Sequence, residues 1–299
     1  MPNHDGSTKE PSAEEEAKLE RFKERLALEK RIGERMGRVG HKILIASGKG
    51  GVGKTTAAVN LALGLAEAGD SVALLDADIH GPGVPLMLGL AGARPTGTEE
   101  GINPVAYDDN LVVMSMAFLL AGDSDAVIWR GPLKMAMVDN FLADINWGDR
   151  DWFVVDTPPG TGDEILSLAQ RIKDVDGLIM ITTPQEAALA SARKSLTFAV
   201  KTNIPILGVV ENMGPVACPA CGHEMKLFGE GGGPRVAAEF GVPFLGSVPF
   251  DPEAVPESDR GQPLLLTDRD SPAAAAWREI VARLREVVAQ REASRSEEA

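Results

Sequence analysis

Short apolar runs alternate along most of this chain with longer stretches in which apolar residues recur at helical spacing. The runs are continuous, which is typical of strands that helices cover on both faces, whereas a strand with one face in solvent would alternate apolar and polar residues. The pattern therefore predicts an α/β fold with three layers and a doubly wound, mostly parallel sheet. The predicted strands are residues 43–46, 72–75, 111–114, 152–155, 178–182, 206–210 and 244–247.

The N-terminal region departs from this pattern. Residues 1–18 are polar and acidic, and we expect a disordered tail there. In residues 19–38 apolar positions recur at roughly helical spacing among many arginines and lysines, which predicts an amphipathic helix. We expect this helix to pack on the outer face of the domain, with a partner or a membrane surface as the alternative. Its apolar positions are Leu19, Phe22, Leu26, Ile32 and Met36.

A second amphipathic helix is predicted near the C-terminus, at the end of a domain that spans residues 39–290. The many glutamates around its apolar stripe favour packing against the core over binding to a membrane surface. Residues 291–299 are expected to form a charged tail. The stripe consists of Trp277, Val281, Leu284 and Val288.

Composition narrows the possible partners. A chain of 299 residues with 44% apolar residues can bury one sizeable core. Acidic residues outnumber basic ones 44 to 30, and the net charge of −14 does not favour a nucleic acid held through its phosphates. No apolar run is long enough to span a bilayer, and the N-terminus lacks the basic-then-apolar order of a signal peptide. We therefore expect a cytoplasmic protein with no stable membrane association.

A glycine-rich loop follows the first predicted strand and precedes a helical stretch at residues 56–68. Glycines let successive backbone N–H groups converge on an anion without Cβ clashes, Lys54 can reach the β- and γ-phosphates, and the Thr55 hydroxyl can ligate Mg²⁺. The match to the Gly-x-x-x-x-Gly-Lys-Thr phosphate loop predicts a nucleotide site. The residues expected to bind the nucleotide are Gly48, Lys49, Gly50, Gly51, Val52, Gly53, Lys54, Thr55 and Thr56.

Carboxylates stand at the ends of two other predicted strands. Asp76 and Asp78 are separated by one residue, so in an extended chain both side chains point the same way. We expect Asp78 to orient or deprotonate the attacking water, or to hold Mg²⁺ through water, and Asp76 to support the metal shell. Asp156 is expected to coordinate Mg²⁺, because this cation prefers oxygen ligands. Gly160 and Gly162 follow it and permit a switch loop.

A second lysine, Lys49, stands near the start of the phosphate loop, where it can scarcely reach the same phosphates from the same side as Lys54. In this respect the loop resembles the deviant Walker A motif of the MinD, ParA and nitrogenase iron protein group. The resemblance implies that Lys49 contacts nucleotide across a dimer interface. Lys49, Lys54 and Asp78 are thus the expected catalytic residues.

Further motifs extend the resemblance over about residues 38–270, to the Mrp/ApbC family of iron–sulfur cluster carrier ATPases. The family implies a homodimer that binds ATP and holds a labile [4Fe–4S] cluster between its subunits, for recipient apoproteins and with assembly scaffold proteins as further candidate partners. It also implies that the Asn212 amide, a donor and an acceptor, meets the edge of adenine. Gly83 stands where the family usually has serine. The motifs are residues 47–56, 76–82, 129–132, 156–163, 211–213, 218–222, 228–232 and 241–246.

The chain has two cysteines, Cys218 and Cys221, whose spacing indicates a metal or redox role before a structural disulfide. A [4Fe–4S] cluster needs four thiolates, so a two-fold dimer that contributes this pair from each chain meets the requirement. Zn²⁺ is a rival, because Cys-x-x-Cys-Gly-His also resembles a zinc knuckle and His223 could complete a ligand set. A redox dithiol is the third option.

These observations favour an ATP-hydrolysing iron–sulfur cluster carrier. Two other classes stay open. A MinD/ParA-like positioning ATPase would need a membrane or DNA surface, for which neither the charge nor the terminal helix gives clear support. A zinc-bridged dimeric regulatory ATPase would carry no cluster chemistry, and metal and sulfide analysis separates it from a carrier.

Overall fold

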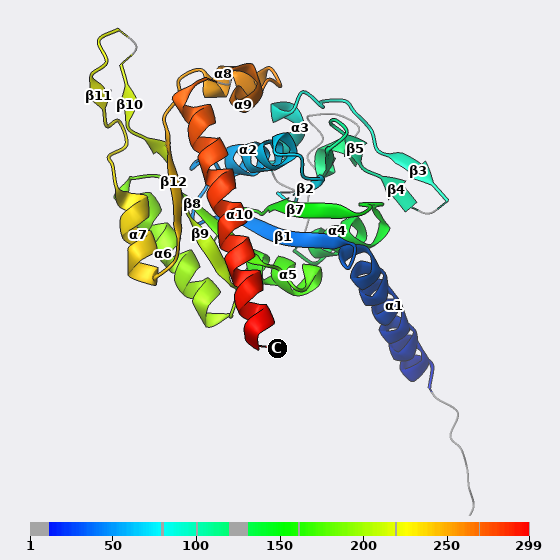
Figure 1. Cartoon of the computed structure of the whole chain (residues 1–299). Helices are drawn as coiled ribbons and strands as arrows, with labels where there is room; N and C mark the ends of the chain where they lie inside the picture. Colours follow the sequence, from blue (N-terminus) through cyan, green and yellow to red (C-terminus); the bar gives the residue numbers. More distant parts are fainter. Residues whose placement is uncertain are drawn as a thin grey trace, which may run out of the picture.

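The computed structural model describes residues 12–78, 81–99, 101–119, 131–160, 162–218, 220–268 and 270–298. Within this part of the chain an eight-stranded sheet has the order β12-β9-β8-β1-β7-β2-β6-β5 (Figure 1). All seven predicted strands are present and run parallel to their neighbours, while the edge strand β5 pairs antiparallel with β6. The strands are β1 (Val39–Ser47), β2 (Val72–Asp76), β5 (Val105–Ala106), β6 (Leu111–Ser115), β7 (Arg150–Asp156), β8 (Gly177–Thr182), β9 (Ile206–Gly214) and β12 (Phe244–Pro249).

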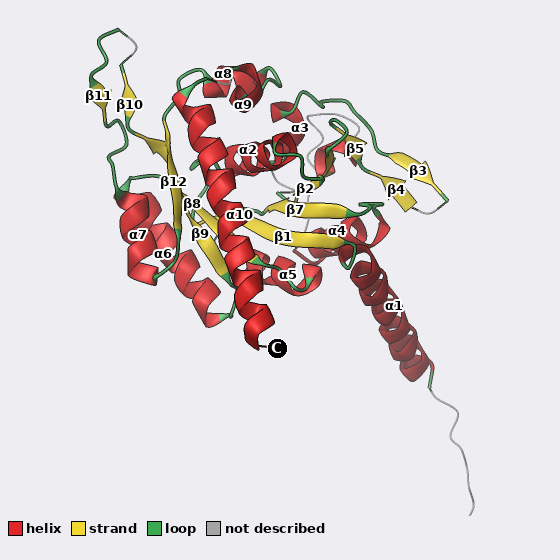
Figure 2. Cartoon of the chain, viewed as in Figure 1, coloured by secondary structure: helices red, strands yellow, loops and turns green. Residues whose placement is uncertain are grey.

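Helices cover both faces of the sheet, which confirms the predicted three-layer α/β architecture (Figure 2). On one face, α2 (Lys54–Glu67) and α10 (Pro272–Glu298) pack against each other and against the strands. The opposite face is covered by α4 (Gly131–Asp144), α5 (Asp163–Ile172), α6 (Glu186–Lys201) and α7 (Gly232–Phe240). The shorter elements are α3 (Val84–Met87), α8 (Ala254–Asp259), α9 (Leu264–Thr267), the 3₁₀ turn Met116–Leu119, and strands β3 (Thr96–Thr98), β4 (Gly101–Asn103), β10 (Val216–Ala217) and β11 (Glu224–Met225).

The core explains why the strands are uniformly apolar. β7 lies between β1 and β2 in the middle of the sheet, where helices cover both faces, and Phe153 within it is fully buried. Phe153 meets Trp147 edge-on, with ring centroids 4.8 Å apart, and the Trp147 indole donates a hydrogen bond to the Phe141 carbonyl at 3.1 Å. The indole N–H of Trp147 therefore has a hydrogen-bond partner inside the core. On α10 the predicted stripe at Trp277, Val281, Leu284 and Val288 is buried, which confirms its packing role.

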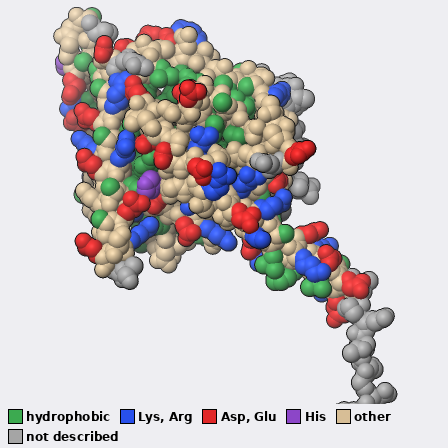
Figure 3. Space-filling model, turned by 45° about the vertical axis from the view of Figure 1, so that its right-hand side comes forward, with side chains coloured by type: hydrophobic (Ala, Val, Ile, Leu, Met, Phe, Trp, Pro, Cys, Tyr) green, Lys and Arg blue, Asp and Glu red, His purple; other side chains and the backbone are tan. Residues whose placement is uncertain are grey.

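The N-terminal helix, α1 (Ala13–Met36), begins before residue 19, so residues 13–18 are helical and not disordered. The reason is a capping box: the Ser12 hydroxyl accepts from the Glu15 N–H, and the Glu15 carboxylate accepts from the Ser12 N–H. Only the end of α1 packs on the domain as expected, through buried Ile32 and Met36. Its first half projects away, so the side chains of its other predicted apolar positions are exposed (Figure 3); Leu19 is 53%, Phe22 53% and Leu26 47% exposed.

The predicted charged tail is also helical. Residues 291–298 continue α10, and this end of the helix is attached to the sheet. Arg291 donates to the Ile206 carbonyl at 2.6 Å, and Arg295 lies 3.7 Å from Asp176. Among the helices in the described ranges, none is both long and apolar enough to cross a membrane.

Candidate functional site

The phosphate loop joins the carboxyl end of β1 to the start of α2, as the sequence predicts (Figure 1). Gly51 and Gly53 have φ angles of 80° and 84°, in the left-handed region that glycine adopts without a steric penalty. Gly53 also caps the N-terminus of α2, so the free N–H groups and the positive end of the helix dipole lie at the loop. This arrangement suits an anion such as a phosphate.

Lys54, Thr55 and Asp156 converge beside the loop. Lys54 is buried, and its Nζ lies 2.5 Å from Oδ1 of Asp156 and 3.9 Å from Oδ2 of Asp78. The Thr55 hydroxyl donates to the other carboxylate oxygen of Asp156 at 2.7 Å. A hydroxyl and carboxylate oxygens are the donors that Mg²⁺ prefers, so these residues fit the expected magnesium site.

Asp76 lies next to Asp156, because the two are register partners at the ends of neighbouring parallel strands. Its carboxylate is fully buried and accepts three hydrogen bonds, from the N–H groups of Asp78 (3.1 Å) and Val84 (3.3 Å) and from the Ser115 hydroxyl (3.1 Å). These bonds fix the side chain beneath the loop. Asp76 is therefore held next to Asp156, while Asp78 lies closer to Lys54, with 3.9 Å between its Oδ2 and the Lys54 Nζ.

The side chains that meet beside the loop include three carboxyl groups, of Asp76, Asp78 and Asp156, and one amine, of Lys54. Burial raises the pKa of Asp76 well above its usual value, and the charge of Asp156 raises it further. Burial also raises the pKa of Asp156, although Lys54 and the Thr55 hydroxyl act in the opposite direction. A divalent cation would relieve this excess of carboxylates, because it stabilises their charged form.

Lys49 is half-buried and makes no hydrogen bond or ion pair with any residue in the described ranges. The loop backbone beside it packs closely on α6, since a Cβ on Gly48 would lie 2.3 Å from the backbone of Ser191. The structure thus brings Lys54, but not Lys49, next to Asp78 and Asp156. This placement is compatible with a target for Lys49 outside its own chain.

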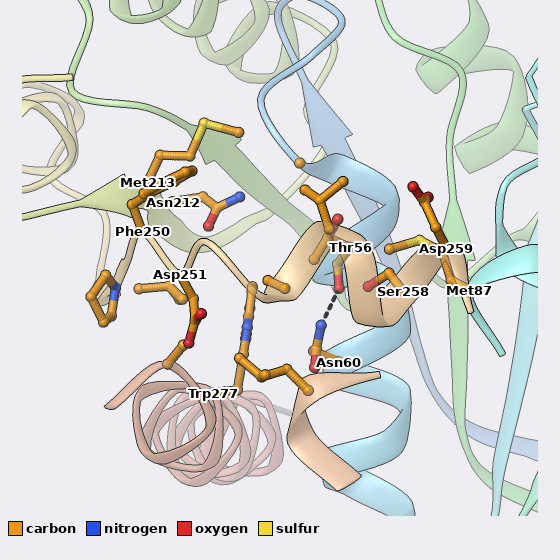
Figure 4. A pocket seen from close by; sticks show the side chains of 17 residues that line it. Thr56, Asn60, Met87, Asn212, Met213, Phe250, Asp251, Ser258, Asp259 and Trp277 are labelled. Carbon is orange, nitrogen blue, oxygen red and sulfur yellow. Dashed lines mark hydrogen bonds between the residues drawn. The ribbon is translucent and has the colours of Figure 1, made fainter. Parts of the chain in front are cut away.

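A cavity of about 250 Å³ lies against the loop and the first turn of α2 (Figure 4). Gly53 and Thr56 line it on one side and Asn212, from the end of β9, on another. The Asn212 amide donates to the Val52 carbonyl at 3.0 Å. A Cβ on Gly53 would lie 2.1 Å from the same amide nitrogen, so glycine allows this close approach of β9 to the phosphate loop.

Three further cavity residues were not predicted as site residues. Phe250 and Asp251 follow β12, and Trp277 comes from α10, where the sequence indicated a core position alone (Figure 4). The strand-end rule that identified Asp156 applies equally to the segment after residues 244–247, since parallel strands bring their carboxyl ends to one edge. The cavity is therefore lined by aromatic and polar side chains together, as is typical of small-molecule sites.

The cysteines lie on a projecting hairpin, residues 215–231, which we call the cysteine arm (Figure 1). It is built on the antiparallel pair β10–β11; Cys218 is half-buried, Cys221 is exposed, and both thiols are free. The pKa of Cys218 is lowered, because backbone N–H groups of Ala220 and Cys221 and the Cys221 thiol donate to its sulfur. A lowered pKa favours the thiolate, which is the form that binds metals.

Across the described ranges no group of three or more His, Cys, Asp or Glu residues is placed to hold a metal ion. His223 is therefore not brought together with the thiols as a third ligand of this kind. The predicted motif residues Ile79, His80, Trp129, Arg130, Thr161 and Pro219 lie outside the described residues.

Known proteins resemble this chain over most of its length. The ParA-type NUBPL iron-transfer P-loop NTPase family matches residues 38–285. A protein of Methanocaldococcus jannaschii named iron-sulfur cluster carrier protein is 46% identical over 258 residues, 86% of this chain and 88% of that protein. A protein of Saccharolobus solfataricus with the same name is 42% identical over 262 residues, 88% of each chain.

Solved structures also resemble this chain. The nucleotide-binding protein of Archaeoglobus fulgidus, in complex with ADP, has a TM-score of 0.71 and 35% identity, covering 83% of this chain and 95% of that one. The cell division ATPase MinD of Pyrococcus furiosus has a TM-score of 0.58 and 21% identity, covering 83% and 99%, which shows a shared fold. The chain therefore belongs to the NUBPL iron-transfer P-loop NTPases and is an ATPase with the MinD/ParA fold.

Proposed function

We propose that this chain is an iron–sulfur cluster carrier in which two copies hold one [4Fe–4S] cluster between their Cys218–Cys221 pairs and transfer it to recipient apoproteins. The observation that carries the proposal is a pair of free thiols on an arm that emerges beside the nucleotide cavity. The names of the two archaeal relatives support the same cargo. One pair per chain supplies half of the four thiolates that such a cluster requires.

The nucleotide site has separate roles for its residues. Lys54 would pair with the β- and γ-phosphates, and Thr55 with Asp156 would hold Mg²⁺. Asp76 would support this group, and Asp78 would orient or deprotonate the attacking water. The bound cation would supply charge stabilisation in the transition state.

The adenine base would enter the cavity beside Asn212. Phe250 and Trp277 offer apolar walls, and the Asn212 amide and the Asp251 carboxylate offer hydrogen-bonding groups. Asp251 can accept from an amino group, which adenine has and hypoxanthine lacks. This favours ATP over ITP as the substrate.

Lys49 would contact the nucleotide of the second copy, since it has no partner in the described part of its own chain. The dimer would then depend on both sites: nucleotide at the phosphate loops and the cluster at the arms.

The test is anaerobic reconstitution of the full chain with iron and sulfide, followed by metal and sulfide analysis and mass in solution. A bridging cluster gives about two irons per chain in a dimer by ligand counting. Cys218→Ser and Cys221→Ser should each lose the cluster almost completely, because either change removes two of the four ligands. His223→Ala is the matched control and should keep it.

Two results would overturn the proposal. One is stoichiometric zinc without sulfide, which would indicate a zinc-bridged dimer. The other is iron retained at wild-type levels in both single cysteine variants. ATP hydrolysis should persist in the cysteine variants, because separate segments supply the phosphate loop and its carboxylates.

A further inference from the structure

One residue, Phe250, joins the nucleotide cavity to the cysteine arm. Its side chain lines the cavity (Figure 4). Its N–H donates at 3.0 Å to the carbonyl of Gly214, where β9 ends and the arm begins. Its ring centroid lies 5.5 Å from that of Phe228, with an interplanar angle of 62°. Phe228 lies between β11 and α7, so Phe250 contacts the chain just before the arm begins, at Gly214, and again near its end, at Phe228.

Among the described residues of the arm, the side-chain hydrogen bonds and ion pairs join arm residues to one another and not to the domain. Its two strands are two residues long, and a hairpin of this size is not stable by itself. Near the tip, the Cys218 N–H donates to the His223 carbonyl and the Gly222 N–H to the Cys218 carbonyl, at 2.9 and 2.8 Å. These bonds shape the thiol loop but do not attach it to the domain. The position of the thiols relative to the sheet is therefore set at the ends of the arm.

The two contacts of Phe250 with this part of the chain would respond differently to a base bound in the cavity. At the first end a backbone hydrogen bond joins Gly214 to Phe250, and it can form whichever way the Phe250 ring turns. At the second end the contact is between two rings in an edge-on arrangement, which depends on their orientation. A base that packs against the Phe250 ring would fix that orientation. Phe228 is thus the side chain through which occupation of the cavity can reach the thiols.

We propose that Phe228 is a positioning residue for the cysteine pair: its contact with Phe250 makes the placement of Cys218 and Cys221 depend on a nucleotide in the cavity. The purpose of this coupling, control of cluster binding or release, rests on the proposed function. The coupling itself is a property of the metal-free protein and can be measured there.

The experiment uses the reduced, metal-free full chain and the chromogenic disulfide 5,5′-dithiobis(2-nitrobenzoate). The chain has two cysteines, so the whole signal comes from the arm. In the wild type, saturating MgADP should slow thiol modification about fivefold, the factor that corresponds to ~1 kcal/mol and to the strength of one aromatic pair. In Phe228→Ala the rates with and without MgADP should agree within about twofold.

Three measurements separate positioning from a general loss of structure. Phe228→Tyr keeps the ring and should restore the MgADP effect. Leu227→Ala removes the adjacent side chain, which is 58% exposed, and should behave like the wild type. MgADP affinity, measured by calorimetry, should stay within about threefold in Phe228→Ala, since Phe228 does not line the cavity.

The proposal is wrong if MgADP leaves the wild-type rate unchanged, if Phe228→Ala keeps the full effect, or if that variant loses MgADP binding more than tenfold. None of these outcomes depends on iron. Reconstitution of the same preparations with iron and sulfide tests the carrier function separately, so failure of one idea is distinguishable from failure of the other.

Discussion

Replacement of Glu211 should loosen the base of the cysteine arm. Glu211 is buried in β9, where its carboxylate accepts from the Gly233 N–H at 2.7 Å and from the Ser247 hydroxyl at 3.0 Å. Gly233 lies in the first turn of α7, directly after the arm, and Glu211 lies three residues before β9 ends at Gly214. One side chain thus closes the loop that carries both cysteines.

The expected loss in the free energy of unfolding follows from the polar groups that each substitution leaves without a hydrogen-bond partner. Glu211→Ala leaves the buried Gly233 N–H without its acceptor, at about 1–3 kcal/mol, and removes the charge that faces the N-terminus of α7, at about 0.3–1 kcal/mol. We expect a total loss of about 2–3 kcal/mol in the free energy of unfolding. Glu211→Gln keeps an acceptor for Gly233, and its amide can donate to the Ser247 hydroxyl, which can rotate to accept. Because Glu211 has no ion-pair partner in the described part of the chain, losing the charge also removes a desolvation cost, and we expect a loss of about 1 kcal/mol or less.

The assay is urea unfolding followed by circular dichroism, for Glu211→Ala, Glu211→Gln and Ser247→Ala. Ser247→Ala removes one hydroxyl and leaves the Gly233 bond in place, so it should cost about 1 kcal/mol. Thiol modification of the metal-free Ala variant should also be faster than in the wild type. The reasoning is refuted if Glu211→Ala unfolds like the wild type, or if Gln and Ala destabilise equally.

Three further predictions concern the nucleotide site. Lys54→Ala should abolish ATP binding, measured by calorimetry, since the phosphates lose a charge-assisted contact; unchanged affinity would remove the phosphate-loop assignment. Lys49→Ala should keep ATP binding but lose hydrolysis, and normal turnover would argue against a role across the dimer. The raised pKa values of Asp76 and Asp156 mean that the folded chain binds protons that the unfolded chain has released, so the free energy of unfolding should fall as pH rises above the usual aspartate value of 3.8. Asp76→Asn should flatten this slope in unfolding measurements from pH 4 to 8, and an unchanged slope would contradict it.

The sheet could be predicted because its strands are long, apolar and covered on both faces. In the part of the chain that the structure describes, five other strands escaped prediction, since β3, β4, β5, β10 and β11 are two or three residues long and show no periodic pattern. Such short pairs form only where the surrounding structure brings them together.

The N-terminal helix α1 shows two different limits of prediction from sequence. The start of α1 carries a sequence signal, the Ser12 to Glu15 capping box, but the acidic run around it favours the expectation of disorder. The exposed stripe around Phe22 had no such signal, because helical spacing identifies an apolar face without saying what covers it.

In the site, a contact could be predicted where a parallel sheet brings two motifs to the same edge, and the contacts that depend on the packing of side chains could not. Lys54 and Asp156 belong to separate motifs whose meeting follows from a parallel sheet. Glu211 and Phe250 act through Gly233 and Phe228, and no spacing in the sequence links these pairs.

Adjacent residues at the end of β9 connect the phosphate loop to the cysteine arm. Asn212 holds the phosphate loop through Val52, and its neighbour Glu211 holds the start of α7 after the arm. The next residue, Met213, lines the cavity with a φ of 58°, a left-handed conformation that costs a non-glycine residue of order 1 kcal/mol. The conformation persists because Asn212 before it and the Gly214–Phe250 hydrogen bond after it fix the chain on both sides. Residues 212–214 are thus held at one side by the phosphate loop and at the other by Phe250. A shift of the phosphate loop would therefore also move this segment, and with it the start of the cysteine arm.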